Sequence, residues 1–292
     1  MWDGTQDGSY YRIPCVCVTK RDTLLVAFEH RYAAGDWARM DIELYRSTDG
    51  GEHFAPPVLL AAGSDAGRTV NNPVLIADND GTVHFLYCVE YGLPGGGVFC
   101  RKSTDDGIHW SEPADITAAT APAERNVFAT GPCHGLCLAD GTLLVPAWLV
   151  PKAAGADDHA HHPAQVHLLI SRDNGEHWTL TESIPQGSVE DPNETCAAPL
   201  PDGRVLLNIR TPVPGDCRST AVFDPSFPSG RRSKRSSASP SSTSASRLPR
   251  WQSPRKQAIR RITSPLRAQW TTLQRPAGST SSAASRRSLR RA

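Results

Sequence analysis

Residues 47–54 read STDGGEHF, residues 103–110 read STDDGIHW, and residues 171–178 read SRDNGEHW. All three share the pattern Ser-x-Asp-x-Gly-x-x-aromatic, and we call them the Asp boxes. The Asp carboxylate can accept backbone N–H groups across a turn, and the Gly can take the left-handed conformation that such a turn needs. The aromatic residue can then pack the hairpin onto a neighbouring strand. We therefore expect structural turns, since a calcium loop would need a run of acidic ligands that is missing.

Each Asp box follows a short run rich in β-branched and aromatic residues, and such runs are typical of strands. The three runs are DIELYRS (41–47), GVFCRKS (97–103) and QVHLLIS (165–171). Similar runs cover 24–30, 83–91, 142–150 and 204–210. Asp-Gly turns separate them at 78–82, 139–142 and 201–204. No stretch shows convincing helical periodicity, so the sequence predicts an all-β domain.

The spacing of the Asp boxes indicates the kind of β domain. The boxes begin 56 and then 68 residues apart. A repeat of that length, with one hairpin signature per unit, is typical of a four-stranded propeller blade. The strand pattern lasts for about four such blades. We predict a β-propeller region over residues 1–223.

The remaining residues, 224–292, have a different composition. Although the net charge of the whole chain is +1, residues 1–217 hold 14 basic and 29 acidic side chains. Residues 218–292 hold 17 basic side chains and one acidic one. This Arg-, Ser- and Pro-rich tail lacks a strand pattern and cannot bury a core, so we expect it to be disordered. It begins in the middle of a blade, as after a shift of reading frame. A solvated linker and a nucleic-acid-binding tail are the alternatives.

Several classes of protein are disfavoured by the composition. The chain has no long apolar run, so no transmembrane helix is expected. No secretory signal is visible at its start, so the chain as it stands is predicted to be cytoplasmic. If an upstream part is missing, an extracellular or periplasmic location is the alternative. None of the eight cysteines forms a CxxC pair, and we expect small buried residues in a reducing compartment. Neither a metal nor a cofactor is expected. The histidine-rich stretch 159–167 is interpreted as a solvated loop rather than a metal site.

Polar residues at the ends of predicted strands form the candidate site: Arg12, Arg31, Asp36, Glu194 and Arg210. Taken one at a time, such residues are more often solvated surface groups. Two carboxylates and several arginines that converge on one face would suit hydrolysis of a glycosidic bond in an anionic sugar.

Several motifs together resemble the exo-α-sialidase (neuraminidase) family. They are YRIP (11–14), the Asp boxes and NETCAAPLPDGRVLLNIR (193–210), all in the family's order. GPCHGLCLADGTLLVPAW (131–148) also resembles a central region of that family. The resemblance covers residues 8–223. It implies a six-bladed β-propeller with its site at the centre of one face, and sialylated glycans or glycolipids as substrates rather than nucleic acid.

The resemblance also implies a role for each candidate residue. Arg12 and Arg210 match two of the three arginines that grip the carboxylate of sialic acid. Asp36 matches the general acid/base, and Glu194 matches the base that acts on a tyrosine nucleophile. Arg31 matches a pocket position by its place in the motif.

The chain departs from the family pattern in its later part. The third arginine and the nucleophilic tyrosine belong to the family's last blades, whereas no tyrosine of this chain follows Tyr91. We therefore expect a retaining sialidase scaffold with little or no hydrolase activity. The alternative is an inactive propeller fragment or a module that binds acidic sugars.

Overall fold

The structure is a computed structural model, and part of the chain is described in it. The described residues are 5–6, 8–64, 69–90, 96–120, 125–152, 161–185, 191–212 and 218–226. They all belong to one unit, residues 1–243. Apart from residues 224–226, the predicted disordered tail lies outside the described residues, so the boundary at residue 223 and the character of the tail stay predictions. None of the helices in the described part is long and apolar enough to cross a membrane.

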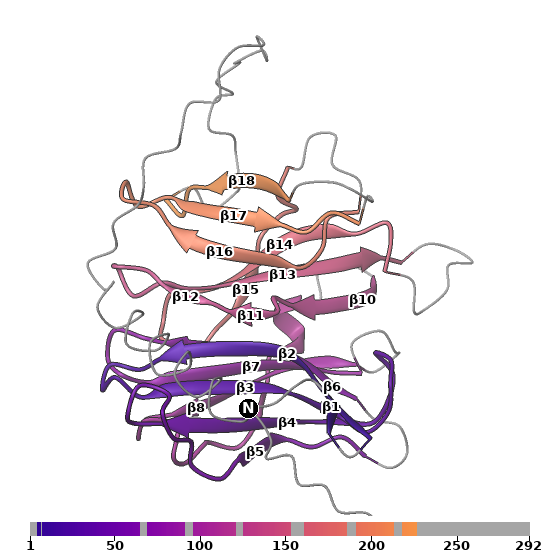
Figure 1. The fold of residues 1–292 in the computed structure, drawn as a ribbon. Helices are drawn as coiled ribbons and strands as arrows, with labels where there is room; N and C mark the ends of the chain where they lie inside the picture. Colours follow the sequence, from indigo (N-terminus) through magenta and orange to yellow (C-terminus); the bar gives the residue numbers. More distant parts are fainter. Residues whose placement is uncertain are drawn as a thin grey trace, which may run out of the picture. The chain divides into compact units, whose positions relative to one another are not determined.

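The described strands form four sheets, which we call blades 1 to 4 (Figure 1). Blade 1 holds β1 (Thr5–Gln6), β2 (Ser9–Val18), β3 (Leu24–Arg31), β4 (Met40–Ser47) and β5 (Val58–Ala61). Blade 2 holds β6 (Val70–Ala77), β7 (Val83–Val89), β8 (Gly97–Ser103) and β9 (Ala114–Asp115). Blade 3 holds β10 (Arg125–Thr130), β12 (Leu136–Cys137), β13 (Leu143–Pro151), β14 (Gln165–Ser171) and β15 (Thr179–Leu180). Blade 4 holds β16 (Thr195–Pro199), β17 (Val205–Ile209) and β18 (Ser219–Phe223).

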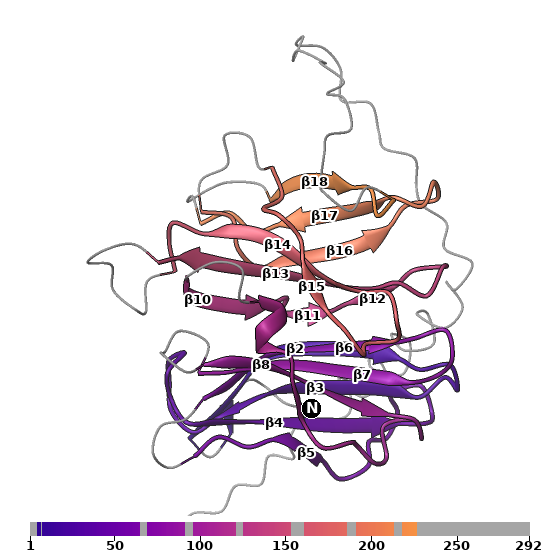
Figure 2. The same ribbon diagram turned by 180° about the vertical axis from the view of Figure 1, so that it is seen from behind.

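Two short elements join blade 3 to blade 2. The strand β11 (Cys133–His134) leaves blade 3 and pairs in parallel with β6. The 3-10 helix η1 (Thr117–Thr120) contacts both β8 and β15, and Figure 2 shows it between these blades. With η1 as the sole helix of the described residues, the predicted all-β fold is confirmed. The arrangement in blades confirms the predicted propeller type.

The apolar core lies between successive blades. One buried cluster joins blades 1 and 2, a second joins blades 2 and 3, and a third joins blades 3 and 4. Because both faces of blades 2 and 3 are covered, β7 is buried along its whole length. In blade 1, by contrast, Val16 and Val18 of β2 are exposed, and in blade 4 Val222 of β18 is exposed. The two outermost blades of the described chain therefore each have one uncovered face.

Early in every blade the chain kinks at a residue that precedes a proline: within β2 and β6, directly after β10, and shortly before β16. The four residues share a left-handed backbone, with φ of 54° at Ile13, 53° at Asn72, 41° at Gly131 and 45° at Asp191. In β2 and β6 the strand register shifts at this point, as in a β-bulge. A bulge redirects the neighbouring side chains of a strand. The kinks therefore set the direction of polar residues at the start of each blade.

The Asp boxes are turns held by a small set of hydrogen bonds. In the third box, the Ser171 hydroxyl donates to Asp173 Oδ1 (2.9 Å) and accepts from the Gly175 backbone N–H (2.8 Å). The backbone N–H of His177 donates to Asp173 Oδ1 (2.9 Å), and Gly175 has a φ of 75°. The same bonds recur in the first and second boxes. The prediction that the boxes are structural turns is confirmed.

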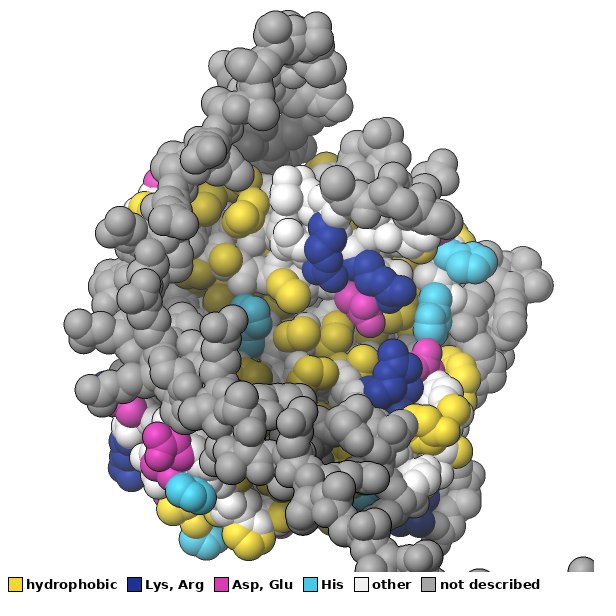
Figure 3. All heavy atoms as spheres, viewed as in Figure 1, with side chains coloured by type: hydrophobic (Ala, Val, Ile, Leu, Met, Phe, Trp, Pro, Cys, Tyr) yellow, Lys and Arg dark blue, Asp and Glu magenta, His cyan; other side chains and the backbone are white. Residues whose placement is uncertain are grey.

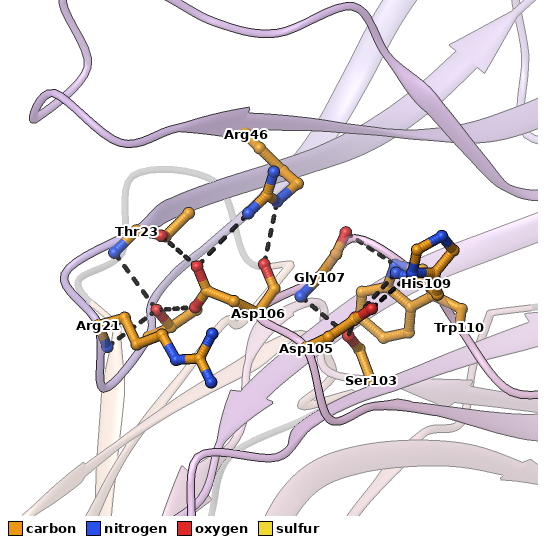
Figure 4. A network of polar contacts seen from close by, with 10 residues as sticks. Arg21, Thr23, Arg46, Ser103, Asp105, Asp106, Gly107, His109 and Trp110 are labelled. Carbon is orange, nitrogen blue, oxygen red and sulfur yellow. Dashed lines mark hydrogen bonds and ion pairs between the residues drawn. The ribbon is translucent and has the colours of Figure 1, made fainter.

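In two of the three Asp boxes, the residue between the Asp and the Gly contacts the preceding blade. In the second box this residue is Asp106, whose carboxylate accepts the hydroxyls of Thr19 and Thr23 in blade 1. Arg46 of β4 donates from Nη2 to the same carboxylate (3.4 Å) and from Nε to the Asp106 carbonyl (2.9 Å), as Figure 4 shows.

The other two boxes differ at this position. In the third box, Asn174 Nδ2 donates to Asp80 Oδ2 of blade 2 (3.4 Å). The first box has Gly50 at this position, which has no side chain to make such a contact. The second and third boxes therefore link neighbouring blades as well as forming turns.

We predict that Asp106→Ala lowers the free energy of unfolding by about 2–4 kcal/mol, because it leaves two buried hydroxyls and a guanidinium without their acceptor. Urea denaturation followed by tryptophan fluorescence measures this. Glu52→Ala, which removes an exposed carboxylate within the first box, is the matched control and should leave the midpoint unchanged. Equal midpoints for Asp106→Ala and Glu52→Ala would show that the link between blades contributes nothing.

The Asp boxes should also make the free energy of unfolding depend on pH in the acid range. Hydrogen bonds from the backbone N–H of His177 and from its ring lower the pKa of Asp173, and equivalent bonds lower the pKa of Asp49 and Asp105. Because the folded chain holds these carboxyls ionised more strongly than the unfolded chain does, it binds fewer protons in acid. The three aspartates therefore contribute to the free energy of unfolding above the unfolded pKa of about 3.9, and this contribution is lost as the pH falls through the folded pKa values. Asp173→Asn should reduce the loss of stability measured between neutral and acid pH, and an unchanged loss would contradict this role.

Candidate active site

A buried ion pair lies at the end of β3. The side chain of Arg31 is 3% exposed and that of Glu29 is 1% exposed. Arg31 Nε donates to Glu29 Oε2 (2.7 Å), and Nη2 donates to the same oxygen. The other carboxylate oxygen, Oε1, accepts the backbone N–H of Asn72 (2.8 Å), which is one of the kink residues of blade 2. Glu29 therefore fixes Arg31 and ties blade 1 to blade 2.

Burial and charge act in opposite directions on this pair. Burial raises the pKa of Glu29, while the Arg31 charge and the Asn72 hydrogen bond oppose that rise. Burial also opposes the charged form of Arg31, but the carboxylates of Glu29 and Asp36 more than compensate, so the pKa of Arg31 is raised. An ion pair that is both buried and fully hydrogen-bonded is expensive to break from one side.

Asp36 lies on the loop after β3 and faces the same arginine. Arg31 Nη1 donates to Asp36 Oδ1 (2.7 Å) and to the carbonyl oxygen of Gly35 (3.1 Å). The Gly35 backbone has a φ of 109°, which favours glycine and lets the loop turn back towards Arg31. Because the Asp36 side chain is 43% exposed, the carboxylate is held on one side and open on the other.

Glu194 and Arg210 form a second pair in blade 4. The Arg210 backbone N–H donates to the Glu194 carbonyl (2.9 Å), so the two residues lie opposite each other just beyond β16 and β17. Their side chains meet through Arg210 Nη1 and Glu194 Oε2 (2.8 Å). With 32% of the Glu194 side chain and 51% of the Arg210 side chain exposed, both remain accessible to a ligand.

His161 lies within electrostatic reach of both pairs. Burial lowers the pKa of its imidazole, and the ring also feels the charges of Asp36, Glu194 and Arg210. Its ring centroid lies 5.4 Å from that of Trp148 in β13 and 6.4 Å from that of Trp37 on the Asp36 loop. A half-buried histidine therefore lies within electrostatic reach of the charged groups of blades 1 and 4.

The interpretation of residues 159–167 as a solvated loop is wrong for two of its histidines. His161 packs against tryptophans, and His167 is buried within β14, where its ring contacts the Thr181 carbonyl. From Gln165 onwards the backbone follows the strand predicted for 165–171, whose apolar residues complete blade 3. His159 lies outside the described residues.

Arg12 lies on β2, immediately before the kink at Ile13, and its side chain is exposed. It pairs in register with Glu29, and Tyr10 pairs with Arg31, so the start of β2 runs beside the buried ion pair. Figure 3 shows acidic, basic and histidine side chains gathered on one face of the molecule. Arg12 thus lies on β2, Arg31 at the end of β3 and Asp36 on the loop after it, while Glu194 precedes β16 and Arg210 follows β17. The structure brings Arg31 to Asp36 and Glu194 to Arg210.

Sequence reasoning missed two residues of this site. Glu29 stands two positions before Arg31, and because side chains alternate along a strand the two residues share a face, which was an available signal. His161 had no comparable signal, since its place depends on how the segment before β14 packs. The expectation that the site holds no metal or cofactor stays a prediction.

Comparison with known proteins identifies the class of fold. Residues 41–223 match the model of the BNR repeat-like domain. The chain therefore belongs to the BNR repeat-like family, and the Asp boxes are its repeats. Among solved structures, the chain is similar to the Hadza microbial sialidase Hz136, with a TM-score of 0.64 and 23% identity over 74% of this chain and 44% of that one. It is also similar to a Dyadobacter fermentans protein of unknown function, with a TM-score of 0.59 and 19% identity over 74% of this chain and 66% of that one.

The named relatives are sialidases. The chain is 26% identical to a sialidase of Bacteroides fragilis over 71% of this chain and 40% of the relative. It is 27% identical to Sialidase-2 of Mus musculus over 62% of this chain and 52% of the relative. The resemblance to the sialidase family is confirmed. The chain spans about half the length of its curated relatives: 40% of the Bacteroides fragilis protein, 52% of the Mus musculus protein and 54% of a sialidase of Paraclostridium sordellii.

We predict that Glu29→Gln lowers the free energy of unfolding by about 2–4 kcal/mol, because the amide removes the buried charge that offsets Arg31. Chemical denaturation measures the change. Asp36→Asn is the matched control, because it keeps an oxygen acceptor for Arg31 at a half-exposed position and should change the midpoint little. Two variants of equal stability would show that Glu29 does not carry the ion pair.

Proposed function

We propose that the chain is a sialidase-type glycoside hydrolase scaffold that binds terminal sialic acid on glycans or glycolipids. One observation carries the proposal. Two arginine–carboxylate pairs, Arg31 with Asp36 and Arg210 with Glu194, come from blades 1 and 4, and His161 lies within electrostatic reach of both. The family match and the sialidase relatives also support the proposal.

The arginines would bind the carboxylate of the sugar. A guanidinium is planar, permanently charged and able to form two parallel hydrogen bonds to one carboxylate. Arg12 is exposed on β2, and Arg210 is half-exposed with one of its nitrogens on Glu194. Arg31 takes a different role, because its buried guanidinium is engaged by Glu29 and Asp36. It positions Asp36 rather than the substrate.

The two accessible carboxylates would carry the proton transfers of a retaining mechanism. Asp36, held on one side by Arg31, would protonate the leaving glycosidic oxygen and later activate water. Glu194 would take the proton of a tyrosine nucleophile, the scheme by which sialidases depart from the two-carboxylate pattern. A neutral phenol suits an anionic sugar because a carboxylate nucleophile would repel it.

This chain has no tyrosine in its later part, where the resemblance to sialidases places the nucleophile. Its six tyrosines all lie at or before residue 91. We therefore propose that the chain recognises sialosides better than it cleaves them, so that the binding module is the second candidate function.

The test measures binding and hydrolysis separately. Isothermal titration with sialyllactose should show binding, and lactose, which lacks the carboxylate, should not bind. Arg12→Ala and Arg210→Ala should each weaken binding by about tenfold or more, the loss of a charge-assisted hydrogen bond. Arg21→Ala, an exposed arginine on the hairpin after β2, is the matched control and should bind as the parent does. Release of a fluorogenic aglycone from its sialoside should stay near background.

Each outcome decides one part of the proposal. Equal binding of sialyllactose and lactose would overturn recognition of the carboxylate. Rapid aglycone release that Asp36→Asn abolishes would show an active hydrolase and overturn the second candidate function.

A further inference from the structure

Two cysteines from different blades meet beside Glu194. Cys133 belongs to β11 and Cys196 to β16, and both are half-buried. Backbone and ring contacts fix these strands on either side of the pair. The Thr195 N–H donates to the Gly131 carbonyl (3.3 Å), and His134 Nε2 lies 3.1 Å from the Ala197 carbonyl. Between these contacts Cys133 and Cys196 lie beside each other on neighbouring strands, and each has the largest influence on the pKa of the other.

The backbone of Cys133 takes a conformation that cysteine seldom adopts. Its φ is 109°, in the region that favours glycine. Strained residues of this kind persist where the surrounding structure fixes them, and they are frequent at functional sites. Here the surrounding structure is the pairing of β11 with β6 and the contact of His134 with β16. This left-handed backbone lies where β11 runs beside β16.

The charges around the pair distinguish the two sulfurs. The hydrogen bond from Cys133 lowers the pKa of Cys196 to about 6, with His134 and Arg218 acting in the same direction and burial and Glu194 acting against it. The same bond raises the pKa of Cys133, as do burial and the neighbouring Cys15 and Glu194. Cys196 is thus the sulfur that becomes a thiolate, and Cys133 is the one that keeps its proton.

The other described cysteines have the opposite character. Burial raises the pKa of Cys17 to about 11 and of Cys100 to about 12, and it also raises the pKa of Cys15, Cys88 and Cys137. Cys15, Cys88 and Cys100 are buried as predicted, whereas Cys17 and Cys137 are partly exposed, as Cys133 and Cys196 are. Reactive cysteines are low in pKa, partly exposed and often placed beside a second, resolving cysteine.

We infer that Cys133 and Cys196 form a redox-active dithiol that a peroxide converts into a disulfide between β11 and β16. The Cys196 thiolate attacks one peroxide oxygen, the O–O bond breaks, and with one proton a sulfenic acid and water result. The Cys133 sulfur then attacks the Cys196 sulfur, the S–O bond breaks, and the Cys133 proton leaves with the hydroxyl as a second water. The two thiols lose two electrons in all, and the peroxide is reduced to two waters. This chemistry is separate from the proposed sugar binding.

Peptide mapping of the full chain tests the disulfide directly. After treatment with hydrogen peroxide, blocking of the remaining thiols and trypsin digestion, Cys133 lies in peptide 126–152 and Cys196 lies in peptide 173–204. Mass spectrometry should find the two peptides joined, with a mass loss of two hydrogen atoms, and dithiothreitol should separate them. Cys133→Ser and Cys196→Ser should each abolish the product. Cys137→Ser, in the same tryptic peptide as Cys133, is the matched control and should leave the product intact.

Labelling of the untreated chain tests the reactive sulfur without any variant. The rate of iodoacetamide labelling of Cys196 should rise to half its maximum near pH 6, and labelling of Cys17 should do so near pH 11. Absence of the joined peptides in the peroxide-treated parent chain would overturn the inference. So would their survival in Cys133→Ser, or labelling of Cys196 that follows the same pH profile as Cys17.

Discussion

The buried carboxylate of Glu29 is the interaction on which the candidate site depends. One of its oxygens binds the Arg31 guanidinium of blade 1, and the other binds the backbone of Asn72 in blade 2. Arg31 in turn holds Asp36. A charge that is nearly inaccessible to water must be matched within the protein, so this chain of contacts allows few alternative arrangements. The position of the exposed acid is therefore set by a residue that no ligand can reach.

The kinks before the prolines extend this organisation to all four described blades. Arg12 precedes the kink at Ile13, the Asn72 kink supplies the N–H for Glu29, and Cys133 and Glu194 follow the kinks at Gly131 and Asp191. An unkinked strand would alternate its side chains between the two faces of the blade. The kink breaks that alternation in β2 and β6, and in blades 3 and 4 it lies just outside β10 and β16. The site is thus assembled from equivalent positions of a repeated unit, each with different residues.

Local pattern was sufficient to predict the blades and two of the contacts in the site. The Asp boxes mark hairpins because Ser, Asp and Gly act within a few residues of each other, and Arg31 and Asp36 lie within one short motif. Glu194 and Arg210 are paired by a hairpin whose turn is visible in the sequence as PDGR (201–204). These features depend on neighbours along the chain.

The features that sequence reasoning missed depend on contacts between blades. His161 acquires its place from Trp37 and Trp148, which lie in different blades. Cys133 meets Cys196 because β11 leaves blade 3 and runs beside β16, and no spacing rule records that path.

The contacts that the Asp boxes make between blades all run in one direction along the chain. The second and third boxes each reach backwards, to the blade that precedes them in the chain, through Asp106 and Asn174. The first box has Gly50 at this position, so it cannot make the same contact with any blade that packs before it. Wherever further blades meet blade 1, that seam must be closed by other groups, and the exposed Val16 and Val18 of β2 are the apolar residues available there.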